Sequence, residues 1–331
     1  LIGITRGILL KLNNEAELAS LLGHELGHIN ARHSSRQSSQ AQVSSLILGG
    51  LSIAAEVYAS GLGDLTQKLG PLVQGAFLSK YSRDNEREAD ALGNEYMVKA
   101  GYSSQGFVGL MEMLNALNKE KPNAALMLFA THPMSSERLE AAMQRSKGVY
   151  QSSKERTLNR ERYMDGIASL RAKKQAIELL QEGERYIAKK AYASAGTAIK
   201  KSIRLAQDDY TAYVVMAKCL MAQKKIAEAV SYADNAKKLY PSETQGHYIS
   251  GIANMELKKF SNAYQDFSRC EQILTGNPMM TFFMGYCLEN TGKQKHAADQ
   301  YMRYLKMVNN AKNQYSQHAY TSLKKWGYIQ K

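Results

Sequence analysis

The sequence predicts a mainly α-helical protein of two domains, the second of which is a solenoid of helical repeats. Small residues recur every 34 positions in the C-terminal half, and apolar residues recur at helical spacing near the N-terminus. The chain has 331 residues, more than the roughly 250–300 at which single hydrophobic cores stop growing. Two domains are therefore expected, and a content of only 5 prolines argues against disorder.

The first domain is expected to contain two principal helices. Ile2–Thr5 have the pattern of the end of a strand. One helix is expected to begin at Asn14, whose side chain can cap it while Glu17, three residues on, completes a capping box. The other is expected to begin near Asp84 and to end at Gly101, since glycine suits the position after a helix. The predicted apolar stripe of the first helix consists of Leu18, Leu21, Leu22, Leu26 and Ile29.

The longest apolar run extends from Val43 to Leu62 and contains Glu56 near its centre. Small Gly and Ser residues interrupt it further. It is too polar for a membrane span, so we expect a buried helix or a lid.

The second half is governed by one period of 34 residues. Two columns of the repeat hold only small residues and a third holds mostly large ones, as closely packed helix pairs require. The pattern resembles the tetratricopeptide repeat. The predicted division is a first domain at 1–150, a helical linker at 151–175, four repeats at 176–311 and a capping helix at 312–331. The columns are Gly183, Ala217, Gly251 and Gly285; Ala195, Ala229, Ala263 and Ala297; and Ile199, Ala233, Phe267 and Tyr301.

The net charge of +13 lies entirely in the second half. Residues 1–150 hold 14 Lys+Arg and 14 Asp+Glu, whereas residues 151–331 hold 29 and 16. A basic helical surface suits acidic protein segments or peripheral contact with anionic lipid headgroups, and the alternative is a solvated lysine-rich surface. No nucleic-acid partner is expected, because the sequence carries no such signature. The 3 cysteines, Cys219, Cys270 and Cys287, fall at apolar helical positions and are predicted to be buried free thiols.

The sharpest chemical signal is the segment His24-Glu25-Leu26-Gly27-His28. Positions i and i+4 of a helix lie on one face, so both imidazoles can reach one metal ion. Glu25 lies beside them, near enough to take a proton from a metal-bound water. The alternative is a pair of packed or surface histidines on an ordinary helix.

A zinc ion with one open position needs a third protein ligand. Glu86 and Asp90, again at i and i+4, supply it on the second helix. One carboxylate can bind the metal while the other accepts an imidazole N–H. Glu88 points elsewhere and is expected to be a solvated surface charge. The extended metzincin motif is excluded, because it needs Gly and His where this chain has Ala31 and Ser34.

The sequence resembles the peptidase family of HtpX and the CAAX prenyl endopeptidases. With the repeats attached, it is most similar to the periplasmic, repeat-bearing branch typified by BepA. The resemblance implies a gluzincin-type metallopeptidase domain followed by a tetratricopeptide-repeat α-solenoid. The matching segments are 4–7, 14–19, 24–28 with Arg32 and His33, 81–83, 86–90, and 131–133 with Arg138.

The resemblance also implies a role for each matching residue. One Zn2+ per chain would be bound by His24, His28 and Glu86, with Glu25 as the general base. Asp90 would orient a ligand imidazole.

Two further histidines and an arginine stand near this set. The resemblance places His132 near the metal, where it stabilises the tetrahedral intermediate or fills the open position of a resting form. Arg138 would hold the His132 loop through an ion pair. His33 is five residues past His28 and is expected to face away from the metal.

The implied function is hydrolysis of internal peptide bonds in misfolded or misassembled envelope proteins of the periplasm. The repeats would dock these clients or an assembly-machine partner. Peptidases of this family bind substrate as an added strand at a sheet edge, and Ile2–Thr5 would be the end of that sheet. The competing hypothesis is a non-catalytic repeat adaptor or chaperone with a closed structural zinc site.

Overall fold

The chain is described here by a computed structural model. All regular structure in the described ranges is helical, so the prediction of a mainly α chain is confirmed. Within these ranges, unit 1 extends to Ile177 and unit 2 begins at Glu178. The domain limits predicted at residues 150, 175 and 311 stay predictions, and the apolar run Val43–Leu62 lies outside the described residues. The residues that the structure describes are 2–33, 36, 81–120, 132, 134–310 and 313–329.

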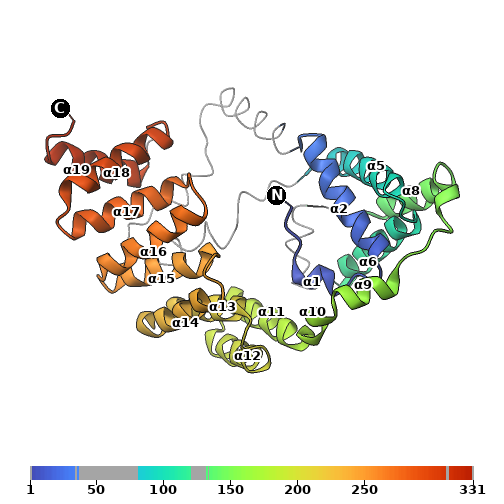
Figure 1. The fold of residues 1–331 in the computed structure, drawn as a ribbon, viewed down its shortest axis with the longest axis horizontal. Helices are drawn as coiled ribbons and strands as arrows, with labels where there is room; N and C mark the ends of the chain where they lie inside the picture. The colour runs from blue at the N-terminus through green and yellow to red at the C-terminus, as the bar shows by residue number, and fades with distance from the viewer. Residues whose placement is uncertain are drawn as a thin grey trace. The chain divides into compact units, whose positions relative to one another are not determined.

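Unit 1 is built around α2, which packs against α5 and α6 (Figure 1). Ile2–Thr5 form no strand, because a strand needs a paired neighbour and the described residues supply none. Thr5 instead caps α1, its hydroxyl accepting a hydrogen bond from the Ile8 N–H. The elements of unit 1 are α1 (Arg6–Leu9), α2 (Glu15–Asn30), α5 (Arg83–Lys99), α6 (Gln105–Glu120), α8 (Ser136–Lys147), a 3₁₀ turn (Gln151–Ser153), α9 (Arg160–Gly166) and α10 (Ala168–Ala172).

Helix α2 begins where its cap predicts. The Asn14 side chain accepts a hydrogen bond from the Glu17 N–H at 2.9 Å. The Glu17 carboxylate reaches back to the Asn13 N–H at 2.6 Å, one residue before the predicted partner. The predicted apolar stripe is only partly buried, because Leu26 and Ile29 are 45% and 55% exposed. The interior face of α2 carries glycines and histidines instead.

Glycines bring the backbones of α2 and α5 into contact. A Cβ placed on Gly23 would lie 2.6 Å from the Gly93 carbonyl oxygen, and one on Gly27 would lie 2.8 Å from that of Ala89. No larger residue fits at either position without moving a backbone. The close crossing therefore sets the face of α2 that bears the histidines against the face of α5 that bears the carboxylates.

The core of unit 1 supports this helix pair from α6, α8 and α9. Phe107 and Met111 of α6 are fully buried, and Met97 of α5 is only 2% exposed. Tyr163 of α9, in the segment predicted as a linker, is also buried in this core. Its hydroxyl donates to the Leu9 carbonyl at 2.6 Å.

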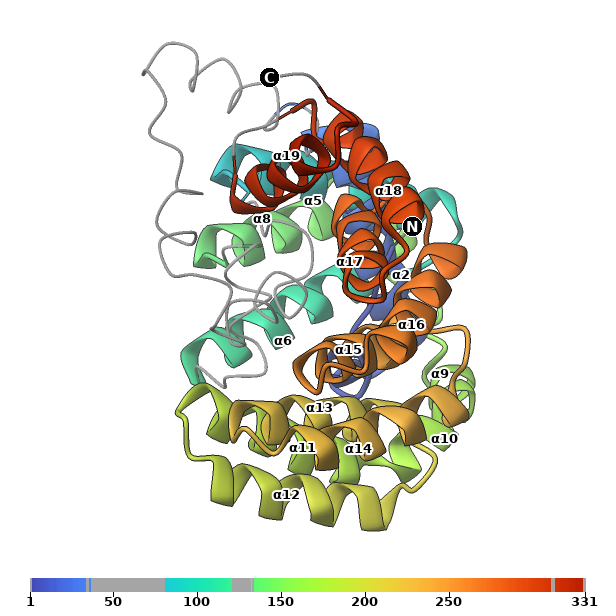
Figure 2. The ribbon, with the colours of Figure 1, turned by 90° about the vertical axis from the view of Figure 1, so that its left-hand side faces the viewer.

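The described part of the chain from Lys174 onward, which holds the described residues of unit 2, forms four helix pairs and a final helix, and each pair packs against the next (Figure 2). The helical repeats predicted in the C-terminal part are confirmed. The three cysteines are buried and free, as predicted. The helices are α11 (Lys174–Ala188), α12 (Tyr192–Leu205), α13 (Tyr210–Ala222), α14 (Ile226–Leu239), α15 (Thr244–Glu256), α16 (Phe260–Ile273), α17 (Pro278–Asn290), α18 (Gln294–Met307) and α19 (Gln314–Lys325).

The columns of the 34-residue period meet inside the repeats. A Cβ on Gly251 would lie 2.7 Å from the Phe267 ring, and one on Gly285 would lie 2.8 Å from the Tyr301 ring. The large residue of the second helix thus occupies the space left by the glycine of the first. In the second repeat both positions are alanine, Ala217 and Ala233, and both are fully buried.

Candidate metal centre

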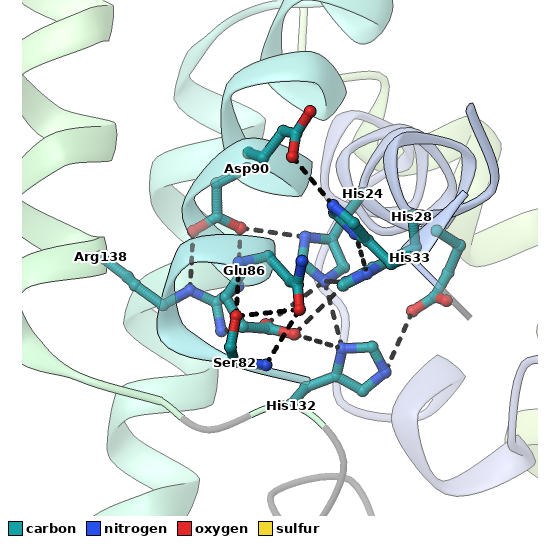
Figure 3. Close-up of polar contacts among 11 residues, drawn as sticks. His24, His28, His33, Ser82, Glu86, Asp90, His132 and Arg138 are labelled. Carbon is teal, nitrogen blue, oxygen red and sulfur yellow. Dashed lines mark hydrogen bonds and ion pairs between the residues drawn. The ribbon is translucent and has the colours of Figure 1, made fainter. Parts of the chain in front are cut away.

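Four side chains from three parts of unit 1 converge on one point (Figure 3). Each offers one ligand atom, and these atoms lie within 4.8 Å of one another. His24 Nε2 is 3.1 Å from His28 Nε2 and 3.3 Å from His132 Nδ1. Glu86 Oε1 is 3.3 Å from His28 Nε2 and 3.1 Å from His132 Nδ1. The four residues are His24, His28, Glu86 and His132.

Four of these separations approach the spacing expected in a tetrahedral metal site. Bonds of about 2.0–2.1 Å at tetrahedral angles place neighbouring ligand atoms roughly 3.3–3.4 Å apart. The four values of 3.1 to 3.3 Å fall close to this spacing, and His24 Nε2 is 3.6 Å from Glu86 Oε2. Three imidazoles and a carboxylate form a donor set that suits zinc. The residues present therefore fit a zinc ion.

A buried carboxylate and a guanidinium lie behind His24 and Glu86. His24 Nδ1 is 2.9 Å from Asp90 Oδ1, which leaves Nε2 directed at the cluster. Arg138 donates from Nε to Asp90 Oδ2 at 2.7 Å and from Nη1 toward Glu86 Oε2 at 2.7 Å. Arg138 of α8 was predicted to hold the His132 loop through an ion pair, and that role stays a prediction. The ion pairs of Arg138 shown here are with Glu86 and Asp90 of α5.

The acids in this network are held in their charged forms. Burial would raise the pKa of Glu86, but hydrogen bonds from His132 and His28 and the charges of His24 and Arg138 hold it well below its ordinary value. Burial would likewise raise the pKa of Asp90, and its bonds with Arg138 and His24 lower it. Both carboxylates are therefore ionised at neutral pH and able to compensate a cation.

Glu25 lies at the accessible edge of the cluster. Its side chain is 26% exposed, and its Oε1 is 3.8 Å from His132 Nε2. A small cavity adjoins it, lined by His24, His132 and Arg138 and by a set of apolar side chains. These apolar residues are Leu21, Leu110, Met111, Leu114 and Met134. A partly exposed carboxylate, a group of candidate metal ligands and an apolar recess thus share one site.

His33 and Glu88 are the residues whose surroundings differ most from the sequence-based expectation. His33 was expected to face away from the metal, and it is not among the four residues of the cluster. It is nevertheless fully buried, and its Nδ1 lies 2.9 Å from His28 Nδ1. Glu88 was expected to be solvated, and it is half exposed yet bonded to His33 Nε2 at 3.1 Å. The helical period could not reveal this, because α2 ends at Asn30 and Arg32 takes a left-handed conformation with φ 54°. Thr131 and Pro133, which flank His132, lie outside the described residues.

Comparison with known proteins provides evidence that is independent of the site geometry. Residues 1–146 match the family model of Peptidase family M48. The chain is 35% identical over 136 residues to metalloprotease YcaL of Escherichia coli strain K12, covering 40% of this chain and 50% of the relative. It is 30% identical over 141 residues to the β-barrel assembly-enhancing protease of the same strain, covering 40% and 28%. The matches thus span half or less of these curated relatives.

Two solved structures align with part of the chain. The protein YrrB, described as a TPR protein with an unusual peptide-binding site, aligns with 62% of this chain and 96% of its own at 14% identity and a TM-score of 0.41. MamA aligns with 45% of this chain and 79% of its own at 17% identity and a TM-score of 0.42.

The family match covers the part of the chain that contributes His24, Glu25, His28, Glu86 and His132. The prediction of a metallopeptidase domain made from these residues is confirmed. Over residues 1–146, which carry all five of these side chains, the chain is similar to peptidase family M48.

Proposed function

We propose that the chain is a zinc-dependent endopeptidase that binds one Zn2+ through His24, His28 and Glu86. The convergence of two imidazoles and a carboxylate from α2 and α5 is the observation that carries the proposal. Asp90 orients His24 through its 2.9 Å contact with Nδ1. Arg138 fixes Glu86 and Asp90 through its ion pairs.

When bound, the zinc ion supplies Lewis acidity that polarises the scissile carbonyl and lowers the pKa of the attacking water. Glu25 takes the proton of that water and returns it to the nitrogen of the leaving amine. Its partly exposed carboxylate, next to the cluster, can reach both. The apolar recess beside Glu25 takes a substrate side chain and excludes water from the bond that is cut.

The test of this assignment is the Glu25→Gln variant. Glutamine keeps the shape of the side chain but cannot take a proton. We expect zinc content equal to wild type and a loss of casein cleavage of roughly 10²–10⁴-fold, the usual contribution of a general base. Wild-type cleavage by Glu25→Gln would remove Glu25 from this role.

The proposed clients are misfolded or misassembled envelope proteins in the periplasm. The support is the name of the relatives in Escherichia coli and Vibrio cholerae, the β-barrel assembly-enhancing protease and its putative counterpart. No described helix is long and apolar enough to cross a membrane. The repeats are proposed to dock clients or an assembly machine, because helical-repeat stacks present extended binding surfaces.

The docking role can be separated from catalysis by deleting residues 178–331. We expect the truncated chain to keep zinc while its affinity for an unfolded β-barrel protein falls. Unchanged client affinity in a truncated chain with full zinc content would contradict the docking role.

A second candidate, a repeat adaptor with a closed structural site, is favoured by His132. With His132 the cluster offers four protein ligands, which is the usual number in structural zinc sites. The His132→Ala variant tests which role His132 has. If His132 only closes the position, its loss raises casein cleavage, and if it stabilises the transition state, cleavage falls. Zinc binding without any chelator-sensitive cleavage in either protein would favour the adaptor.

A further inference from the structure

Helix α2 ends just after the proposed zinc-binding motif, and a histidine that follows the helix lies against the motif. Helix α2 ends at Asn30, and Arg32 has a left-handed backbone with φ 54°. His33 is thereby turned back onto His28, with the two ring centroids 4.9 Å apart and the rings inclined at 73°. The His33 side chain is fully buried. A polar group is brought at some cost into the interior, directly behind one ligand.

The contacts around His33 permit a consistent placement of hydrogen atoms. The Nε2 of His28 faces the cluster, 3.1 Å from His24 Nε2 and 3.3 Å from Glu86 Oε1. A neutral His28 that binds metal through Nε2 carries its hydrogen on Nδ1, which needs an acceptor. His33 Nδ1 lies 2.9 Å away and can accept.

The same reasoning extends one residue further. When its Nδ1 accepts, a neutral His33 carries its hydrogen on Nε2. That nitrogen lies 3.1 Å from Glu88 Oε2 and donates to it. Arg36 Nη1, 3.3 Å from the same oxygen, holds the carboxylate in place. With this placement of hydrogens, each ring nitrogen of His33 and His28 donates a hydrogen bond, accepts one or faces the cluster.

We propose that His33, backed by Glu88, is a positioning residue that holds His28 in the tautomer and orientation that bind zinc. Asp90 does this for His24 directly, at 2.9 Å, whereas His28 receives its support through an intervening imidazole. The stacked Tyr81 ring, with its centroid 4.0 Å from that of His28, confines the same imidazole from another side. The inference rests on the proposed zinc site and adds two residues to it.

The test compares His33→Phe with His33→Asn in the full chain. Phenylalanine keeps a ring in the space but offers no acceptor, while the asparagine side-chain oxygen can stand where Nδ1 stood. We expect His33→Phe to lower zinc affinity, measured by competition with a chromogenic chelator, roughly 10–100-fold, as loss of a ligand's hydrogen-bond partner does. We expect His33→Asn to recover most of it. The visible spectrum of the Co2+-loaded protein should change in His33→Phe and return toward wild type in His33→Asn.

Glu88 provides a second test that does not disturb the interior. Its side chain is 45% exposed, so Glu88→Ala should fold normally. We expect a loss of zinc affinity in Glu88→Ala that is smaller than in His33→Phe. The matched control is Glu95→Ala, on the same helix, whose carboxylate pairs with Lys99 at 2.6 Å instead. It should bind zinc like wild type.

The outcomes separate this inference from the proposed function. A wild-type chain that binds no zinc would refute the zinc site itself. Wild-type zinc affinity and an unchanged Co2+ spectrum in both His33→Phe and Glu88→Ala would overturn the inference alone. Equal losses in His33→Phe and His33→Asn that follow the thermal stability of the apoproteins would assign His33 to packing and would also overturn it.

Discussion

Both units use glycine where two helices cross, but the glycines meet different neighbours. In unit 1 the neighbour of Gly93 is backbone, since a Cβ there would lie 2.6 Å from the His24 nitrogen. In unit 2 the neighbour of Gly251 is a side chain, since a Cβ there would lie 2.7 Å from the Phe267 ring. A side chain can be exchanged or can change rotamer, whereas a backbone can only move away. The crossing in unit 1 is therefore the more constrained of the two.

This difference follows from what each crossing has to do. The α2–α5 crossing sets the distances among the proposed zinc ligands His24, His28 and Glu86, and a metal site tolerates displacements of only about 0.5 Å. The crossings in the repeats only have to fill space. The repeats accordingly vary the pair, with Gly251 against Phe267 in one and Ala217 against Ala233 in another. The helix crossing that positions the proposed ligands is thus the one whose spacing is fixed by contacts between backbones.

The largest effect is expected from Gly93→Ala. Its methyl group would push α5 away from α2 and separate Glu86 from the histidines. We expect zinc affinity to fall on the order of 100-fold, the upper end for disturbed ligand support, and the free energy of unfolding to fall by about 3 kcal/mol through overpacking. Chelator competition and urea unfolding measure the two quantities.

Gly166→Ala serves as the control in the same unit, because a Cβ at Gly166 meets nothing within 4 Å. It should leave both quantities unchanged. Wild-type zinc affinity in Gly93→Ala would show that the crossing can relax without disturbing the ligands.

A smaller effect, confined to the repeats, is expected from Gly251→Ala. The added methyl group meets the Phe267 ring, so we expect a loss of about 2 kcal/mol in the free energy of unfolding of unit 2. Adding Phe267→Leu should relieve the clash, giving a favourable interaction energy of about 1–2 kcal/mol between the two substitutions. Zinc affinity should stay at the wild-type value. Strict additivity of the two substitutions would mean that the ring does not limit this position.

Much of the helix packing in the two units could be predicted from the sequence. The 34-residue period identified the columns that contain Gly251 and Phe267, because a repeat displays its packing several times over. The cap at Asn14 and the end of α5 before Gly101 were likewise correct. The spacing of His24 and His28 and of Glu86 and Asp90 predicted two facing pairs, and the structure brings them together.

What the sequence left open depends on contacts between elements. The period of α2 placed Leu26 and Ile29 on a buried stripe, yet both are exposed, because the glycine crossing and the histidines take the interior face. The spacing of five residues from His28 gave no reason to expect a contact with His33, whereas α2 ends at Asn30 and Arg32 takes a left-handed conformation. A single left-handed residue has no periodic signal, so only the three-dimensional structure could reveal it.

The smallest expected effect concerns left-handed residues, which the two units also use differently. In unit 2 they recur with the repeat, at Lys190, Lys224 and Lys258 with φ of 58°, 62° and 58°, and at Gly292 with φ 75°. A lysine in this conformation carries a cost of about 1–2 kcal/mol that glycine avoids, less the greater entropy that glycine loses on folding. We therefore expect Lys224→Gly to raise the free energy of unfolding by about 0.5–1 kcal/mol in urea titrations.

The neighbouring Lys225→Gly is the matched control, because Lys225 has φ −87° and no such cost to relieve. It should not raise the free energy of unfolding, because it relieves no left-handed strain. Neither change should alter zinc affinity.

The substitution Arg32→Gly in unit 1, by contrast, acts on the turn that places His33 against His28. A glycine there relieves the same strain but also loosens the turn, so zinc affinity should fall even as the backbone cost is removed. Zinc affinity that is unchanged in Arg32→Gly would show that burial of His33 alone, without a stiff turn, keeps it against the ligand.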